Sequence, residues 1–354
     1  MARQSVVGAQ FVRLSISIML AVSIGLPASN VGATDASSKY HIAQNWPLAG
    51  NGGWSSMAVD EHTHRLYVPR DTRVAVLDTD NGRAVGEIDG LTDARAIALS
   101  QNGEVGYISD GIAGTVHLFN RSTLHLISSV VVGGTVDEIV LDPATHLLFV
   151  FNTHDKSIAV VDTSSLRVTS RIGLPGRPGG AISNGNGIVF VNLVSSSQIA
   201  RIDARALKLN AVWDLGPCIG PSGMAFDAAH SRIFSVCENK KMAVSDTNAG
   251  RLVGTVTIGE GAKTVEFDAI NSLVLTANAE GTITVVKEET PDTFDVVQTL
   301  ATDPGARTMI FDHDRRRLYL ISAKFGQRPG PTSEELQFRP TPVPDSAVIL
   351  VISR

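Results

Sequence analysis

The sequence of 354 residues contains only two cysteines, and aromatic side chains make up just 5% of it. Glycine-rich loops of the kind that cradle nucleotide phosphates ahead of a helix are missing, and the nine histidines are scattered rather than spaced as metal ligands. A formal net charge of −5 provides no bulk attraction to nucleic acid or anionic lipid. We therefore expect no metal, no cofactor and no nucleic-acid partner.

Residues 1–33 have the composition of a signal peptide. Arg3 and Arg13 precede an apolar core at residues 14–26, and Val31-Gly32-Ala33 supplies the small side chains that a signal peptidase requires. The core is shorter than the roughly 20 residues that a membrane-spanning helix needs, although a membrane anchor is the alternative reading. We expect cleavage after Ala33 and export to the periplasm or the extracellular space, with no membrane span afterwards.

From residue 34 onward, one order of short apolar runs and polar turns recurs. The centres of equivalent runs lie 40, 42, 41, 44, 40 and 45 residues apart. Periods of about 40–45 residues with four short strands each are typical of propeller blades. The sequence thus predicts an all-β fold over residues 34–354, a seven-bladed β-propeller of four-stranded antiparallel blades. The seven centres are Tyr67, Tyr107, Phe149, Phe190, Phe234, Val274 and Tyr319.

The runs differ in composition, and this assigns each run a place in its blade. Continuously apolar runs such as Ile158-Ala159-Val160-Val161 predict strands buried between neighbouring blades. Alternating runs such as residues 167–172 predict outer strands with one solvated face. Runs with small side chains, such as Ala96-Ile97-Ala98, fit the crowded axis.

The last unit is one strand short when the chain reaches Arg354. The missing strand is found at the other end, where residues 41–48 align with the outer-strand run at residues 167–174. We therefore expect the N-terminal strand to complete the C-terminal blade, placing Ile42 in the sheet of Val348. Such pairing removes a free sheet edge and closes the ring.

Three short motifs recur in the units, and the third unit shows them most clearly. They are Phe149-Val150-Phe151-Asn152, Ala159-Val160-Val161-Asp162 and Gly176-Arg177-Pro178-Gly179-Gly180-Ala181. The motifs resemble those of the YVTN-repeat (YncE-like) β-propeller family. The resemblance implies a binding or surface propeller without a shared active site. The Trp-Asp signature of WD40 blades is found only once, at Trp213-Asp214.

The two cysteines belong to the fifth unit. Cys218 precedes its innermost run and Cys237 ends the next run, so the topology places both at one end of the same blade. Because an exported protein meets an oxidising environment, we expect a disulfide. Two buried free thiols and a zinc site remain as alternatives.

The starts of the innermost runs should converge on the axis and form a ring at a tunnel mouth. Their cations predict a site for a polar or anionic ligand. In the alternative interpretation they pair with Asp93, Asp137, Glu138 and Glu260 and only solvate the tunnel. The ring positions are Ser55, Arg95, Asp137, Gly179, Ser222, Lys263 and Arg307, with Trp54, Glu138 and Arg177 adjacent.

The loop at residues 323–345 is unusually long and contains five prolines. Proline stiffens such a loop, and long loops are often functional. We expect it to lie across the top face, the end of the propeller where the innermost strands begin, and to border the tunnel mouth. A solvated flap is the alternative.

These observations predict an exported, monomeric, non-catalytic propeller. It would bind a polar or anionic small ligand, or a protein partner, at the top-face tunnel mouth through Trp54, Arg95, Asp137, Glu138, Arg177, Lys263 and Arg307. Two further hypotheses stay open. One is a propeller enzyme of the lyase or lactonase type assisted by a metal, and the other is a propeller subunit of a periplasmic redox complex.

Overall fold

The structure, a computed structural model, describes residues 39–101, 103–326 and 342–354. The predicted signal peptide and residues 327–341 of the long loop lie outside the described residues. No helix within the described ranges is long and apolar enough to cross a membrane. The described chain consists of 28 β-strands in seven four-stranded antiparallel sheets.

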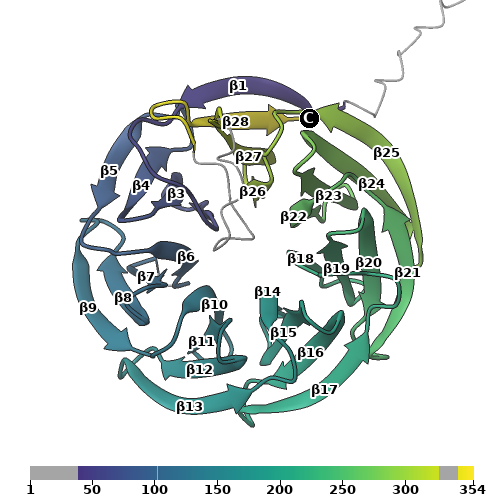
Figure 1. Cartoon of the computed structure of the whole chain (residues 1–354), viewed down its shortest axis with the longest axis horizontal. Coiled ribbons are helices and arrows are strands. Elements are labelled where there is room, and N and C mark those ends of the chain that lie inside the picture. Colours follow the sequence, from purple (N-terminus) through teal and green to yellow (C-terminus); the bar gives the residue numbers. More distant parts are fainter. Residues whose placement is uncertain (1–38, 102, 327–341) are drawn as a thin grey trace, which may run out of the picture. The chain divides into compact units, whose positions relative to one another are not determined.

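The seven sheets stand around a common axis as the blades of a propeller (Figure 1). Blades 1 to 6 each run in chain order from the axis to the rim, and blade 7 combines the two ends of the chain. The innermost strands are β2 (Ala58–Asp60), β6 (Ala94–Leu99), β10 (Val136–Asp142), β14 (Pro178–Ser183), β18 (Met224–Asp227), β22 (Ala262–Asp268) and β26 (Thr308–Asp312). The second strands are β3 (Arg65–Arg70), β7 (Val105–Asp110), β11 (Leu147–Asn152), β15 (Ile188–Leu193), β19 (Arg232–Cys237), β23 (Leu273–Asn278) and β27 (Arg317–Ser322).

The two remaining strand positions show the burial that the sequence predicts. The third strands are buried at nearly every central position, whereas the outer strands expose most of their side chains. The third strands are β4 (Arg73–Asp78), β8 (Thr115–Asn120), β12 (Ser157–Asp162), β16 (Gln198–Asp203), β20 (Lys241–Asp246), β24 (Thr282–Thr290) and β28 (Val348–Ser353). The outer strands are β5 (Ala84–Ile88), β9 (Leu126–Val131), β13 (Arg167–Gly173), β17 (Lys208–Asp214), β21 (Arg251–Thr257), β25 (Thr293–Ala301) and β1 (His41–Pro47).

Blade 7 is closed by the N-terminal strand, as predicted. Strand β1 pairs antiparallel with β28, so that Ile42 lies opposite Ile352 and Trp46 opposite Ile349. In Figure 1 the two strands lie side by side at the rim of the ring. The edge of β28 is therefore covered, which removes a site for non-native strand pairing.

The hydrophobic core lies between blades rather than within them. One cluster joins Trp46 and Tyr319 of blade 7 to Leu66 and Leu77 of blade 1. Because each blade buries its two faces only against its neighbours, the stability of a blade depends on a closed ring.

In blades 1, 2, 3, 5 and 7 the bend that leads into the innermost strand is held by the last residue of the second strand. In blade 1 Arg70, which is 1% exposed, donates hydrogen bonds to the carbonyl oxygens of Gly50 and Gly52. In blade 3 the Asn152 amide donates to the Gly133 carbonyl. The position is thus structural, although its chemistry changes from blade to blade. Its occupants are Arg70, Asp110, Asn152, Leu193, Cys237, Asn278 and Ser322.

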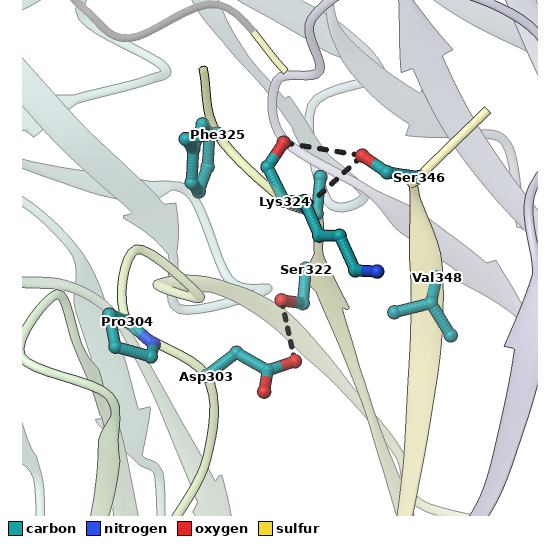
Figure 2. A pocket seen from close by; sticks show the side chains of 8 residues that line it. Asp303, Pro304, Ser322, Lys324, Phe325, Ser346 and Val348 are labelled. Carbon is teal, nitrogen blue, oxygen red and sulfur yellow. Dashed lines mark hydrogen bonds between the residues drawn. The ribbon is translucent and has the colours of Figure 1, made fainter. Parts of the chain in front are cut away.

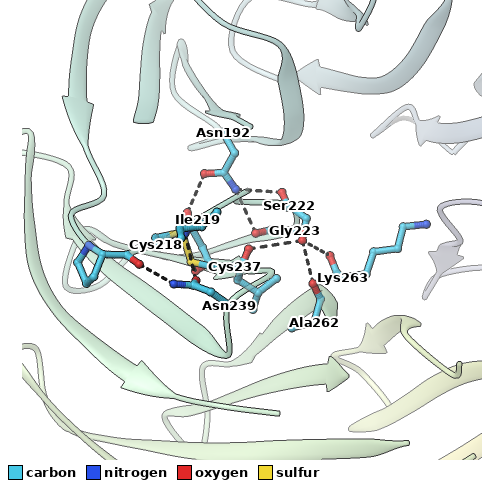
Figure 3. The surroundings of a disulfide bond; sticks show 12 residues. Asn192, Cys218, Ile219, Ser222, Gly223, Cys237, Asn239, Ala262 and Lys263 are labelled. Carbon is cyan, nitrogen blue, oxygen red and sulfur yellow. Dashed lines mark hydrogen bonds between the residues drawn. A yellow bond between two sulfur atoms is a disulfide. The ribbon is translucent and has the colours of Figure 1, made fainter. Parts of the chain in front are cut away.

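In blade 5 the same position uses a covalent bond. Cys237 is joined to Cys218 of the leading bend by a disulfide, and both residues are buried (Figure 3). Beside them the Asn239 amide donates to the Pro217 carbonyl, and its oxygen accepts from the Ile219 backbone. The predicted disulfide is confirmed, and it pins the leading bend to its own blade.

Replacing both Cys218 and Cys237 with alanine should lower the free energy of unfolding by about 2–4 kcal/mol, because the bridge constrains a 19-residue segment of the unfolded chain. Unfolding in guanidinium chloride measures this loss. Reducing agent should lower the stability of the natural protein by a similar amount and leave the double variant unchanged. Equal stability of the two proteins without reductant would contradict the prediction.

Candidate functional site

The predicted mouth residues come from six of the seven blades. We call Trp54, Arg95, Asp137, Glu138, Arg177, Lys263 and Arg307 the axial group. All of them lie at, or just before, the start of an innermost strand. Figure 1 shows these strands nearest the axis.

Irregular strand pairing occurs at several of these residues. The register of β6 on β7 shifts between Ala94 and Ile97, the interval that contains Arg95. A matching shift in β10 contains Asp137 and Glu138, and a third in β22 contains Lys263. A β-bulge turns a side chain out of the regular alternation, so the irregularities free these charged groups from ladder positions.

Glu138 is the most strongly perturbed member of the axial group. Burial raises the pKa of Glu138 to about 7, and the neighbouring negative charge of Asp137 adds to the rise. Lys263 of blade 6 and the Ser56 hydroxyl of blade 1 oppose the rise. These side chains start from three different blades, so the ring brings together residues that are more than 80 positions apart in sequence.

The backbone at Lys263 and Arg307 is held by hydrogen bonds between adjacent blades. The Ser222 hydroxyl of blade 5 lies 3.3 Å from the Lys263 carbonyl, to which it donates. The Thr264 hydroxyl of blade 6 donates to the Arg307 carbonyl at 3.0 Å. The backbone that carries the Lys263 and Arg307 side chains is therefore fixed by hydrogen bonds to the neighbouring blade.

Arg95 has a carboxylate partner. Its Nε atom lies 2.7 Å from Asp93 Oδ2, and the Asp93 side chain is only 12% exposed. For Arg95 the structure therefore supports the alternative interpretation, in which the ring cations pair with nearby carboxylates. Glu260, also considered as a partner of the ring, is instead 2.9 Å from Lys240.

Two members of the axial group contact other parts of the chain. Trp54 packs against Phe325 at the base of the long loop, with the ring centroids 6.0 Å apart. Arg177 is exposed in the leading bend of blade 4, where its backbone bonds to Val194 and Ser195. Whether the rest of the long loop borders the axial group falls outside the described residues.

Phe325 also lines a hollow of about 530 Å³ on the top of blade 7 (Figure 2). On one side Ser322 donates a hydrogen bond to Asp303 at 2.8 Å, and the Lys324 ammonium extends toward Val348. The hollow lies beside the axial group and shares with it the contact between Trp54 and Phe325.

Glu266 of β22 was missed by the sequence reasoning. Burial raises its pKa to about 8. A signal did exist, because Glu266 occupies a pairing position of the innermost strand at which the other six blades have an apolar residue. Those residues are Ala58, Ala98, Val140, Ile182, Ala225 and Ile310.

Lys263 and Arg307 thus lie at the same end of the innermost strands as Glu138, a carboxyl group whose charge changes near neutral pH. The chain matches no family model and no curated protein sequence, so its functional assignment depends on this geometry.

Proposed function

We propose that the protein is an exported, non-catalytic propeller that binds a small polar ligand carrying an anionic group at the axial group. The observation that supports this is the convergence of Ser56, Glu138 and Lys263 from three blades. Ionisable groups with strongly shifted pKa values cluster at functional sites, which is the ground for placing the binding site at Glu138.

The proposal includes membership of the YVTN-repeat class and export. Asn152 of the repeat motif supports the first, because its side chain bonds to Gly133 and to the backbone of the following turn. A motif with that role maintains the fold and does not imply a reaction. The buried disulfide supports export, since such bonds persist in oxidising compartments. Cell fractionation would test it.

Lys263 and Arg307 are expected to carry most of the affinity for an anion. The double variant Lys263→Ala/Arg307→Ala should weaken binding by roughly 10–100-fold, because hydrogen bonds to charged groups contribute about 1.5–3 kcal/mol. Isothermal titration with citrate and with inorganic phosphate measures the change. Arg251→Ala, at the exposed start of β21, is the matched control and should bind as the natural protein does. Unchanged affinity in the double variant would overturn the proposal.

The affinity for these anions should also fall as the pH rises through about 7. Glu138 is neutral below its pKa and negative above it, so its ionisation places a repelling charge beside Lys263. We expect up to about tenfold weaker binding at pH 8 than at pH 6, which corresponds to 1.4 kcal/mol. Phosphate and citrate both titrate in this range, so sulfate, whose charge does not change between pH 6 and pH 8, is the decisive probe. Glu138→Gln should remove the pH dependence and leave the fold unchanged.

A second candidate function, a propeller enzyme, is favoured by the same carboxyl group. A glutamate with a pKa of about 7 has the value suited to a general acid or base at neutral pH. Turnover of an ester or lactone substrate that is lost in Glu138→Gln while binding persists would favour this candidate. Binding without turnover favours the first.

A further inference from the structure

A second arrangement of side chains recurs at the end of the blades opposite the axial group. Several innermost strands end in an aspartate whose carboxylate is capped by the side chain three residues later. Thr145 caps Asp142, for example, and its hydroxyl donates at 2.7 Å. In blade 5 the capping residue is His230, whose Nδ1 atom lies 2.6 Å from Asp227 Oδ2.

In some blades a residue at the end of the third strand reaches toward this aspartate of the preceding blade. In blade 2 that residue is Arg121, and it forms a buried ion pair with Asp60 of blade 1. The equivalent residue in blade 6 is Glu288, because Lys287 pairs with Leu273 as Asn120 pairs with Val105. At the joint between blades 5 and 6, a carboxylate therefore occupies the place of the neutralising cation.

Glu288 is both buried and unsatisfied. Its side chain is 1% exposed, and neither carboxylate oxygen accepts a hydrogen bond from a donor group among the described residues. Its Oε1 atom lies 3.4 Å from His230 Nδ1, and the Asp227 side chain is 3% exposed. The carboxylates of Asp227 and Glu288 each have an oxygen within 4.8 Å of the other. Two buried carboxylates so close together are costly unless a positive charge lies between them.

The nearest arginine is engaged elsewhere. Arg232 donates to the carbonyl oxygens of Pro291 and His230 and pairs with Asp292 at 2.8 Å and with Asp246 at 3.2 Å. Its guanidinium is therefore held away from the Glu288 carboxylate by four other partners.

We propose that Asp227, His230 and Glu288 bind a divalent transition-metal cation, best represented by Zn²⁺. One ligand atom from each residue lies within 4.8 Å of the other two. A tetrahedral zinc ion with ligand bonds of about 2.0–2.1 Å separates its ligand atoms by roughly 3.3 Å, so small shifts suffice to close the site. His230 is 43% exposed, which leaves the fourth position accessible to water.

The ligand types favour a transition metal over Ca²⁺ or Mg²⁺. Those two ions select oxygen ligands and higher coordination numbers, whereas an imidazole beside two carboxylates suits Zn²⁺. The two carboxylates and neutral His230 balance the charge of the ion. Since Asp227 and His230 belong to blade 5 and Glu288 to blade 6, the bound ion would join two blades of the ring.

The test is a titration of tag-free protein, stripped with EDTA, with ZnCl₂ at pH 7.5. We expect one equivalent of Zn²⁺ to bind and to raise the melting temperature, because an ion that binds only the folded state stabilises it. Glu288→Gln and His230→Ala should each weaken the binding at least tenfold. His64→Ala, which alters an exposed histidine in the corresponding turn of blade 1, is the control and should bind normally.

The variant Glu288→Arg guards against a misleading loss of fold. It places an arginine beside Asp227 in the way that Arg121 lies beside Asp60, so the variant should be folded, thermally stable without metal, and unable to bind Zn²⁺. Three outcomes would overturn the proposal. They are an absence of stoichiometric binding, binding that survives in both Glu288→Gln and His230→Ala, and a preference for Ca²⁺ over Zn²⁺.

Discussion

Replacing Trp46 with alanine is expected to lower the free energy of unfolding by about 3–5 kcal/mol, the range for deleting a large buried aromatic side chain. Trp46 is 5% exposed and stacks on Tyr319 with ring centroids 5.5 Å apart. It also packs so closely on Gly82 of blade 1 that a Cβ atom there would lie 2.3 Å from the indole ring. The cavity would therefore open where blade 7 meets blade 1.

Ile42→Ala on the same strand is the matched control for Trp46→Ala. Ile42 is 38% exposed, so its truncation should change the stability by less than about 1 kcal/mol. Denaturant unfolding followed by far-UV circular dichroism measures both. Removing residues 40–48 altogether should reduce the melting temperature further, because the edge of β28 loses its partner strand. Equal losses in the two point variants would mean that β1 closes the ring without its tryptophan contact.

Replacing Arg121 with leucine should lower the free energy of unfolding by about 3–5 kcal/mol at pH 7. Arg121 is 4% exposed and donates from Nε to Asp60 at 3.0 Å and from Nη1 to the Ser100 carbonyl at 2.9 Å. Without it, a charged Asp60 that is 3% exposed would remain between blades 1 and 2. Leaving one charge of a buried pair uncompensated costs more than the pair itself contributes.

The loss caused by Arg121→Leu should shrink in acid. Burial acts to raise the pKa of Asp60, but hydrogen bonds from Arg121 and Thr63 outweigh it and hold the pKa below its ordinary value. The ion pair therefore stabilises the fold fully above the unfolded-state pKa of about 3.9 and loses its effect as the pH falls through the folded-state pKa.

Unfolding curves at pH 7 and pH 3 would show this convergence of the natural protein and Arg121→Leu. The double variant Asp60→Asn/Arg121→Leu is the control. It should be more stable at pH 7 than Arg121→Leu alone, because no charge is stranded. A difference between the natural protein and Arg121→Leu that is the same at both pH values would rule out the ion pair as its cause.

The sequence by itself was sufficient for the architecture of this protein. The period of about 42 residues and the contrast between continuous and alternating runs depend only on which face of each strand is buried, and neighbouring residues record that directly. The same holds for the closure by β1, whose pattern matches an outer strand, and for the disulfide, because Cys218 and Cys237 lie in one blade.

Only the tertiary structure decided which side chains from different blades meet. Ser56, Glu138 and Lys263 come together because the ring turns their strands toward one axis. His230 is one of the scattered histidines of the sequence, and it lies in a turn of blade 5. Glu288 reaches it across the joint between blades, where register and rotation set the distance. Repeat periodicity fixes the position of a residue within its blade, but contacts between blades also depend on the packing angle, which no single repeat encodes.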